Sequence, residues 1–458
     1  MQWRGAADWL GLGPNGHGRA AAAPRLTPST FEWPKAGVYA PWLWVPLLAL
    51  IAIPFPLFGW PLPERAVPIM WLLVIGGLVL LSRVAQASWP LALLILWAVV
   101  RGAMMQFPHR ALQLLLLLAF ASLLYVAARE LPRRVQRWVA LALMVGLGWE
   151  MAFGVLNLFG TYPGMAWVDP NYHGRPMGFL THTNYYGSFL ALALPVAWSL
   201  FGVGAAAAVF GMIVMTLSGG PVISASVGVL FMVWADLGRR TRWAVAGGLA
   251  GVIATVMTRH EWRLSGRREV WFAFLPEYLR YPVIGQGLGS WRVLAEDLNT
   301  RFTREAVQAK VAAGASLEQA TQQTPPSVFA TLQAHNEPYQ LAFELGLIGL
   351  VLVGLWVLQA GLLARRALAN EPAPVGPWWA PGHLPLERAW IAVLLTAAVN
   401  SLGSPVFHLP AQAAITLWAL GSLQGSVARL GTQAAPDYRP LIGTKPQRRP
   451  KRVAAERT

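Results

Sequence analysis

The residues best suited to chemistry in this sequence are His335-Asn336-Glu337-Pro338, which stand directly before a long apolar stretch. Pro338 suits the first turn of a helix, where its missing N–H group costs nothing, and Asn336 or Glu337 can cap the free amides. Because a helix N-terminus disfavours an imidazolium, His335 in this position is suited to act as a neutral general base. The alternative is that His335 is a polar residue at the membrane surface with no catalytic role.

The helix expected after Pro338 carries three further residues of interest. Gly346 and Gly349 are three residues apart, which indicates a small face where another helix can pack closely. Glu344 could face the candidate site, but we expect it to face a neighbouring helix. The pattern therefore predicts a capped and tightly packed helix that fixes His335.

Cationic and amide side chains upstream could bind an anion near this base. Arg267 and Arg268 precede a glycine turn at 285–290, which by itself is weak evidence for a phosphate site. Their planar guanidinium groups could hold a diphosphate, or could contact lipid headgroups instead. In an earlier loop, Arg175 and Asn184 place another guanidinium and an amide close to a second helix start.

The composition limits the class of protein that can carry these residues. Of 458 residues, 55% are hydrophobic, 12% are charged and none is cysteine. A soluble domain carries about 25% charged residues, so a soluble globular enzyme, a disordered chain and a disulfide scaffold are excluded. The lack of cysteine also excludes thiol catalysis and cysteine-bound metal centres. The net charge of +16 lies largely in short loops and the C-terminal tail, which is typical of membrane-protein orientation rather than nucleic-acid binding.

The elements that must position the candidate residues are membrane-spanning helices. A span needs about 20 mostly apolar residues, since the hydrocarbon layer is about 30 Å thick. On this basis the sequence predicts an all-α polytopic membrane protein with about twelve transmembrane helices. The predicted spans lie near 40–60, 66–82, 88–105, 111–128, 137–159, 186–201, 203–217, 221–236, 241–257, 338–364, 388–403 and 411–428.

Basic residues between the spans predict the orientation of the chain. They cluster between the fourth and fifth spans, between the eighth and ninth, after the tenth, and in the tail. With the N-terminus in the cytoplasm, all of these clusters are cytoplasmic, as the positive-inside rule requires. The same orientation places the segments 160–186 and 258–337 on the outer face, together with the candidate residues.

The second outer segment is predicted to form a small helical domain. A helical pattern at 269–281 and a helix-like run at 291–322 flank the glycine turn. The expected organisation is a cytoplasmic N-terminal segment at 1–37, spans one to nine at 38–257 with the periplasmic loop 160–186, a large periplasmic loop carrying the active site at 258–337, spans ten to twelve at 338–428, and a basic cytoplasmic tail at 429–458.

Four motifs in this order resemble the O-antigen ligase and O-antigen polymerase superfamily, over roughly residues 170–350. The first consists of His335-Asn336, nine residues, and Gly346-x-x-Gly349. The other motifs are Gly266-Arg267-x-x-x-Trp271, Gly285-x-Gly287-Leu288-Gly289-Ser290, and Arg175-x-x-Gly178-Phe179 ahead of Asn184 and an LALALP run. Outside this range only the twelve-span layout is similar.

The resemblance implies a GT-C-like glycosyltransferase in the bacterial inner membrane, with both termini in the cytoplasm. Such enzymes move a glycan from undecaprenyl diphosphate to an acceptor hydroxyl on the periplasmic face, without a metal ion or cofactor. Attack opposite the leaving group would invert the anomeric centre. The acceptor could be lipid A–core in a ligase, a second lipid-linked repeat in a polymerase, or a protein.

The resemblance also assigns roles to single residues. His335 corresponds to the general base, with Asn336 beside it in the signature. Arg267 corresponds to the arginine that holds the diphosphate, and Arg175 matches a basic position in the earlier loop, ahead of Asn184.

One departure from the family concerns a second donor-binding arginine. Family members commonly carry a Ser-Arg pair where this sequence has Ser218-Gly219. Either Arg175, Arg268 or Arg292 substitutes for that arginine, or the donor is bound differently. A membrane transporter is the alternative from another class, although ionisable residues within the spans are few and no inverted repeat is evident.

Overall fold

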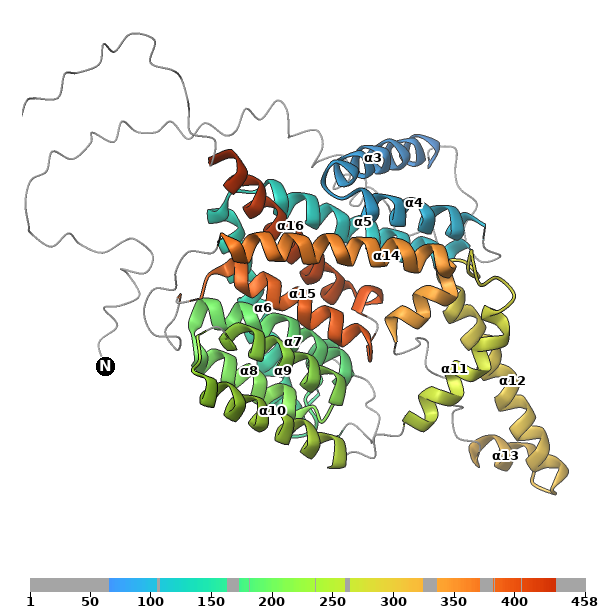
Figure 1. Ribbon diagram of the computed structural model, residues 1–458. Coiled ribbons are helices and arrows are strands. Elements are labelled where there is room, and N and C mark those ends of the chain that lie inside the picture. Colours follow the sequence, from blue (N-terminus) through green and yellow to red (C-terminus); the bar gives the residue numbers. More distant parts are fainter. Residues whose placement is uncertain are drawn as a thin grey trace, which may run out of the picture.

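The computed structural model describes residues 66–104, 108–162, 173–180, 182–234, 236–259, 264–323, 336–370, 382, 384–404 and 406–433. Within these ranges every regular element is a helix and there is no strand (Figure 1). The longer helices are α3 (Ala66–Ala87), α4 (Trp89–Ala103), α5 (Pro108–Glu130), α6 (Arg133–Leu158), α7 (Thr183–Phe201), α8 (Val203–Met215), α9 (Gly219–Trp234), α10 (Arg239–Arg259), α11 (Leu264–Tyr278), α12 (Ser290–Ala312), α13 (Leu317–Gln323), α14 (Glu337–Ala369), α15 (Leu386–Ser401) and α16 (Pro410–Gln433), and two short 3₁₀ helices are η3 (Gly178–Leu180) and η5 (Val406–His408).

The apolar stretches of the sequence coincide with these helices. Each of the eleven predicted spans from 66–82 onward corresponds to one helix, whereas the span near 40–60, the segment 1–37 and residues 434–458 lie outside the described residues. Three helical stretches are long and apolar enough to cross a membrane, namely Gln113–Glu130, Arg133–Leu158 and Glu337–Ala369, and α4, α8 and α9 are apolar but shorter. An all-helical fold compatible with a membrane protein is therefore confirmed, while the twelve crossings and the GT-C relationship stay predictions.

Helices α5 and α16 pack along each other through two glycines of α16. A Cβ atom added at Gly421 would lie 3.0 Å from the Cβ atom of Ala128 and closer still to the Tyr125 carbonyl oxygen. One at Gly425 would lie 3.1 Å from the Arg129 carbonyl carbon. This four-residue spacing of glycines lets two helix backbones approach, as it does in membrane helix pairs.

Helix α7 is the central element of the largest core cluster. Almost every residue between Thr183 and Leu200 is buried, and side chains from Leu190 to Leu194 are fully covered. The run is apolar on all sides, which is typical of a helix surrounded by other helices. Helices α6, α8, α9, α15 and α16 pack around it.

Ion pairs join three helix termini at one end of the bundle. Arg133 at the start of α6 pairs with Glu387 at the start of α15, with Nη2 and Oε1 3.0 Å apart. Arg388 pairs with Asp236, which follows α9, with Nη1 and Oδ2 2.6 Å apart. The loops predicted to be cytoplasmic therefore do meet at one end, and the compartment they face stays a prediction.

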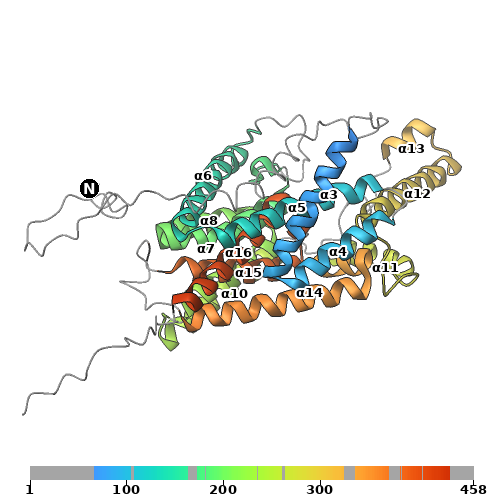
Figure 2. The same cartoon turned by 90° about the horizontal axis from the view of Figure 1, so that it is seen from above.

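Helices α11, α12 and α13 lie together at one end of the bundle, as both views show (Figures 1 and 2). The helical pattern predicted at 269–281 corresponds to α11, and the run predicted at 291–322 corresponds to two helices, α12 and α13, which residues 313–316 separate. An aromatic cluster joins them to the start of α14: the rings of Phe274 in α11 and Trp291 in α12 are stacked with centroids 3.7 Å apart, and Phe343 meets both edge-on. This helical group is thus packed against the element that follows His335.

Candidate active site

The start of α14 is capped as the sequence predicts. Asn336 is the N-cap residue, and its Oδ1 accepts a hydrogen bond of 2.9 Å from the Tyr339 amide. Its Nδ2 donates to the Leu402 carbonyl oxygen at 3.2 Å, which ties the helix start to the loop after α15. His335 itself lies outside the described residues, so its role as general base stays a prediction.

Helix α14 is broken at Gly346, which the sequence did not predict. Gly346 has φ 67° and ψ −167°, a region open in practice to glycine alone. The expectation that Gly346 and Gly349 form a packing face for another helix is therefore wrong. Gly346 instead lies against the backbone of the loop at Val283 and Gly285, and a Cβ atom at Gly349 would meet the Leu345 side chain across the break. The first segment of α14, residues 337–345, is a separate short helix.

The glycine turn before α12 satisfies the backbone groups that this break exposes. Two loop amides donate to carbonyl oxygens at the end of the short helix, and two amides after the break donate to loop carbonyl oxygens. These bonds are Gln286 N to Phe343 O at 2.8 Å, Gly287 N to Glu344 O at 2.8 Å, Leu347 N to Pro282 O at 2.9 Å and Ile348 N to Val283 O at 3.2 Å. Broken helices persist at membrane depth only when such partners exist.

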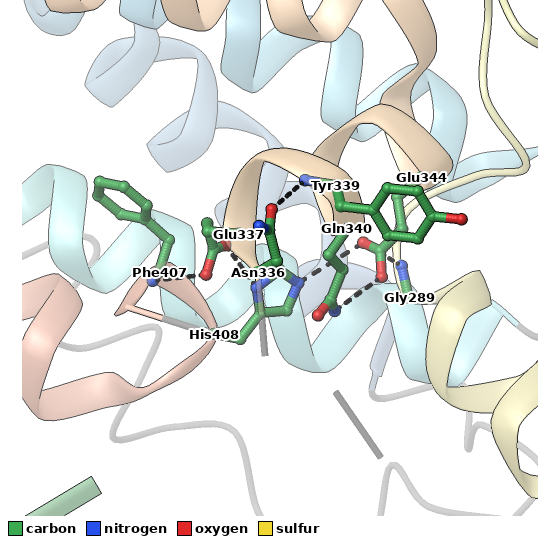
Figure 3. A network of polar contacts seen from close by, with 8 residues as sticks. All are labelled: Gly289, Asn336, Glu337, Tyr339, Gln340, Glu344, Phe407 and His408. Carbon is green, nitrogen blue, oxygen red and sulfur yellow. Dashed lines mark hydrogen bonds and ion pairs between the residues drawn. The ribbon is translucent and has the colours of Figure 1, made fainter. Parts of the chain in front are cut away.

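A histidine from a distant loop lies between two glutamates of the short helix (Figure 3). The Nδ1 atom of His408 is 2.6 Å from Oε1 of Glu337, and its Nε2 is 3.6 Å from Oε2 of Glu344. The second distance is too long for a hydrogen bond but short enough for an ion pair. The other oxygen of Glu337 accepts from the Phe407 amide at 3.3 Å, so one carboxyl group holds two adjacent residues of η5.

Glu344 is fully buried and faces this cluster. Its Oε2 accepts from the Gly289 amide at 2.9 Å, and its Oε1 accepts from Nε2 of Gln340 at 3.1 Å (Figure 3). The expectation that Glu344 faces a neighbouring helix is therefore wrong. Its partners are instead the Gly289 amide at the start of α12, the Gln340 side chain of its own helix and His408 of η5.

The surroundings of His408 favour its charged form. Burial lowers the pKa of His408, but the charge and hydrogen bond of Glu337, followed by the contact with Glu344, raise it well above its ordinary value of 6.5. Two carboxyl groups within reach of one imidazole outweigh the loss of solvent.

A cavity of about 390 Å³ opens beside these residues. It lies where the starts of α5, α7, α12, α14 and α16 meet η5. Its polar lining consists of Gln113, Tyr185, Arg292, Gln340, Glu344 and His408. The cavity thus combines a guanidinium, an imidazolium and a carboxyl group with hydrogen-bonding side chains, which suits a polar ligand that carries both charge and hydroxyl groups.

The structure brings only some of the predicted site residues to this cavity. Arg292 lines it, and its Nε forms an ion pair of 3.2 Å with Glu296 while 42% of the side chain remains exposed. Arg267 and Arg268 lie in α11, within one turn before Trp271, whose carbonyl oxygen accepts from the Tyr339 hydroxyl at 2.6 Å. The side chains of these two arginines lie outside the described residues.

Asn184 directly precedes a cavity-lining residue and is held by polar contacts with two other segments of the chain. It is buried, its Oδ1 accepts from the Ser218 hydroxyl at 2.9 Å, and its Nδ2 lies 3.4 Å from Oγ of Ser404. It therefore joins the start of α7 to the turn before Gly219, where the family arginine is missing. The next residue, Tyr185, reaches the cavity.

Arg175 lies in a loop held against α6. The Asn157 side chain accepts from the amides of Met177 and Gly178, both at 3.0 Å, and Glu150 accepts from the Phe179 amide at 2.9 Å. Arg175 is half-buried and is not among the described residues that line the cavity. Its part in ligand binding stays a prediction.

Sequence reasoning missed His408 and its pairing with Glu337 and Glu344, although both glutamates were considered for other roles. A signal was present, since the predicted orientation puts the loop between the last two spans on the same face as His335. Within the described residues, no three His, Asp or Glu side chains are grouped to hold a metal ion. That the reaction needs no metal ion or cofactor stays a prediction.

Comparison with known proteins bears on one part of the chain. Residues 204–354 match the family model described as O-antigen ligase, and this range includes Arg292, the glycine turn and the short helix of α14. No curated protein matches the chain significantly. The family match supports ligase or polymerase activity in general, a membrane-embedded protein, and lipid-linked glycans as the general substrate class. Residues 204–354 thus carry the O-antigen ligase domain, which supports assignment of the protein to the O-antigen ligase and polymerase superfamily.

Proposed function

We propose that this protein is a metal-independent, inverting glycosyltransferase of the O-antigen ligase type. It moves a glycan from undecaprenyl diphosphate to a hydroxyl of lipid A–core, on the periplasmic face of the bacterial inner membrane. The observation that carries the proposal is the polar cavity at the capped start of α14, next in the chain to His335. The match of residues 204–354 supports the general class of activity.

The chemistry requires two kinds of group. The departing diphosphate needs fixed positive charge, which is more effective in a water-poor site than in bulk solvent. Arg292 on the cavity wall can supply part of it, and Arg267 with Arg268 on α11 supply the rest in this proposal. The acceptor hydroxyl must lose a proton, and a positioned histidine such as His335 contributes about 10²–10⁴-fold to such a step.

The direct test is transfer by the full-length protein in vesicles that contain undecaprenyl-diphosphate-linked O-antigen and lipid A–core. His335→Ala should fold and bind donor, yet lose transfer by about 10²-fold or more. Arg292→Ala should weaken donor binding, whereas the matched control Arg304→Ala, exposed on the same helix, should behave as wild type. Transfer by His335→Ala at nearly the wild-type rate would refute the mechanism.

The acceptor is tested in cells. Surface polysaccharide from a deletion strain should show lipid A–core without O-antigen if the protein is a ligase. Lipid A–core carrying a single repeat would instead identify a polymerase, and loss of glycan from a protein alone would identify a protein oligosaccharyltransferase.

A further inference from the structure

His408 is a buried ionisable residue that the proposed chemistry does not use. It lies in η5, between α15 and α16, and contacts Glu337 and Glu344 of the short helix. These glutamates are seven residues apart, two helical turns, so they lie on one face of the helix. A single imidazolium therefore contacts both ends of that helix (Figure 3).

The short helix depends on contacts of this kind. It contains only residues 337–345, and isolated helices shorter than about 12 residues are marginal in water. Its N-terminus is held by the Asn336 cap and its C-terminus by the glycine turn. Among the described residues, His408 contacts both ends of the short helix, through Glu337 and Glu344, and so joins this helix to η5 on the cavity wall.

We propose that His408 is a positioning residue, which holds the short helix of α14 so that Gln340 and Glu344 form the cavity wall. This inference rests on the proposed function, because glycan transfer is the activity that a displaced cavity wall would slow. A group displaced by about 1 Å can lose about 10²-fold in rate, so a small rotation of the short helix would be enough to slow transfer.

The charges around His408 make this arrangement dependent on pH. Within the described residues, the charged or titratable side chains around the cavity are Glu337 and Glu344 on α14, Arg292 on α12 and Tyr185 on α7. His408 also borders a second, smaller cavity whose other lining residues are mostly apolar and come from α4, α5, α14 and α16. The two glutamates are its direct partners, and they attract the imidazolium only while it keeps its proton.

The sign of the pH effect follows from the raised pKa of His408. A group whose pKa is raised on folding stabilises the fold fully below its unfolded value, about 6.5, and loses that contribution as pH rises through the folded value. Stability and transfer should therefore both decline on the alkaline side. Loss of the proton removes the ion pairs with the two glutamates.

The experiment compares wild type, His408→Gln and the double variant Glu337→Gln/His408→Gln, all full length. Transfer is measured in vesicles with undecaprenyl-diphosphate-linked O-antigen and lipid A–core between pH 6 and 10, and the unfolding midpoint Tm is measured in detergent over the same range. His408→Gln should lower kcat about 10- to 100-fold with little change in KM, and should remove the alkaline decline in Tm. His173→Gln, an exposed histidine of another loop, is the control and should change neither.

The double variant covers the case in which His408→Gln fails to fold. It replaces the ion pair by two neutral amides, so its Tm should recover and should not depend on pH over the alkaline range. A wild-type kcat and pH profile in His408→Gln, or an alkaline Tm decline that persists in the double variant, would overturn the proposal. If wild type transfers no glycan while its Tm still declines through His408, the structural role stands and the proposed function fails.

Discussion

The substitution Gly346→Ala tests whether the break in α14 is a requirement of the fold. Gly346 has φ 67° and ψ −167°, and a Cβ atom there would lie 2.5 Å from the Gly285 amide nitrogen and closer still to the Val283 carbonyl oxygen. Both neighbours are backbone atoms of one loop, so neither can rotate away as a side chain could. The loop must move or the helix must straighten.

The expected penalty follows from these two effects. An alanine held in this backbone region costs about 1–3 kcal/mol. Four hydrogen bonds join the loop to the break. Loss of two of them, at about 0.5–1.5 kcal/mol each, adds about 1–3 kcal/mol. The sum is a destabilisation of about 2–6 kcal/mol.

The assay is the Tm of the purified protein in detergent, with Gly354→Ala as the matched control. Gly354 lies on the same helix, and a Cβ atom there would have no neighbour within 4 Å. Alanine is favoured over glycine within a helix by about 1 kcal/mol, so the control should be as stable as wild type or slightly more stable. Equal Tm values for Gly346→Ala and Gly354→Ala would show that the break is not required.

Three further substitutions test other contacts, two through the same Tm measurement and one through hydrogen exchange. Asn336→Ala removes the N-cap hydrogen bond and should lower the free energy of unfolding by about 1 kcal/mol. Asn336→Ser can still accept that bond and should lower it by less. Equal losses would contradict the capping role. Asn157→Leu leaves the amides of Met177 and Gly178 unpaired and should destabilise the Arg175 loop by about 1–3 kcal/mol for each amide. Hydrogen exchange at these two amides should become faster, and unchanged exchange would refute the prediction. Asp236→Asn should cost about 3–5 kcal/mol, because it leaves the buried charge of Arg388 without its anion. The double variant Asp236→Leu/Arg388→Met should restore most of the Tm. A Tm of the single variant equal to that of the double variant would contradict this.

The contacts of His408 with Glu337 and Glu344 could not be predicted from the sequence. His408 is 71 residues from Glu337 in the chain, and neither residue's local sequence indicates the other. The predicted orientation implies that both residues lie on one face of the membrane, but it does not indicate which residues of that face come into contact. The expectation for Glu344 was wrong because its partners, Gly289 and His408, are distant in the chain and approach it only once the helices have packed.

By itself the sequence determined the all-helical fold, the position of most helices and a capped helix start at Asn336 or Glu337, of which the structure shows Asn336 as the cap. These features depend on apolar length, on the local hydrogen bonds of a helix terminus and on the fixed φ of Pro338, all of which a few neighbouring residues specify. Tertiary structure decided the break at Gly346 and the cavity. Both depend on loops from distant parts of the chain that supply hydrogen bonds and charge to the short helix of α14, and such partners are fixed only once the helices have packed.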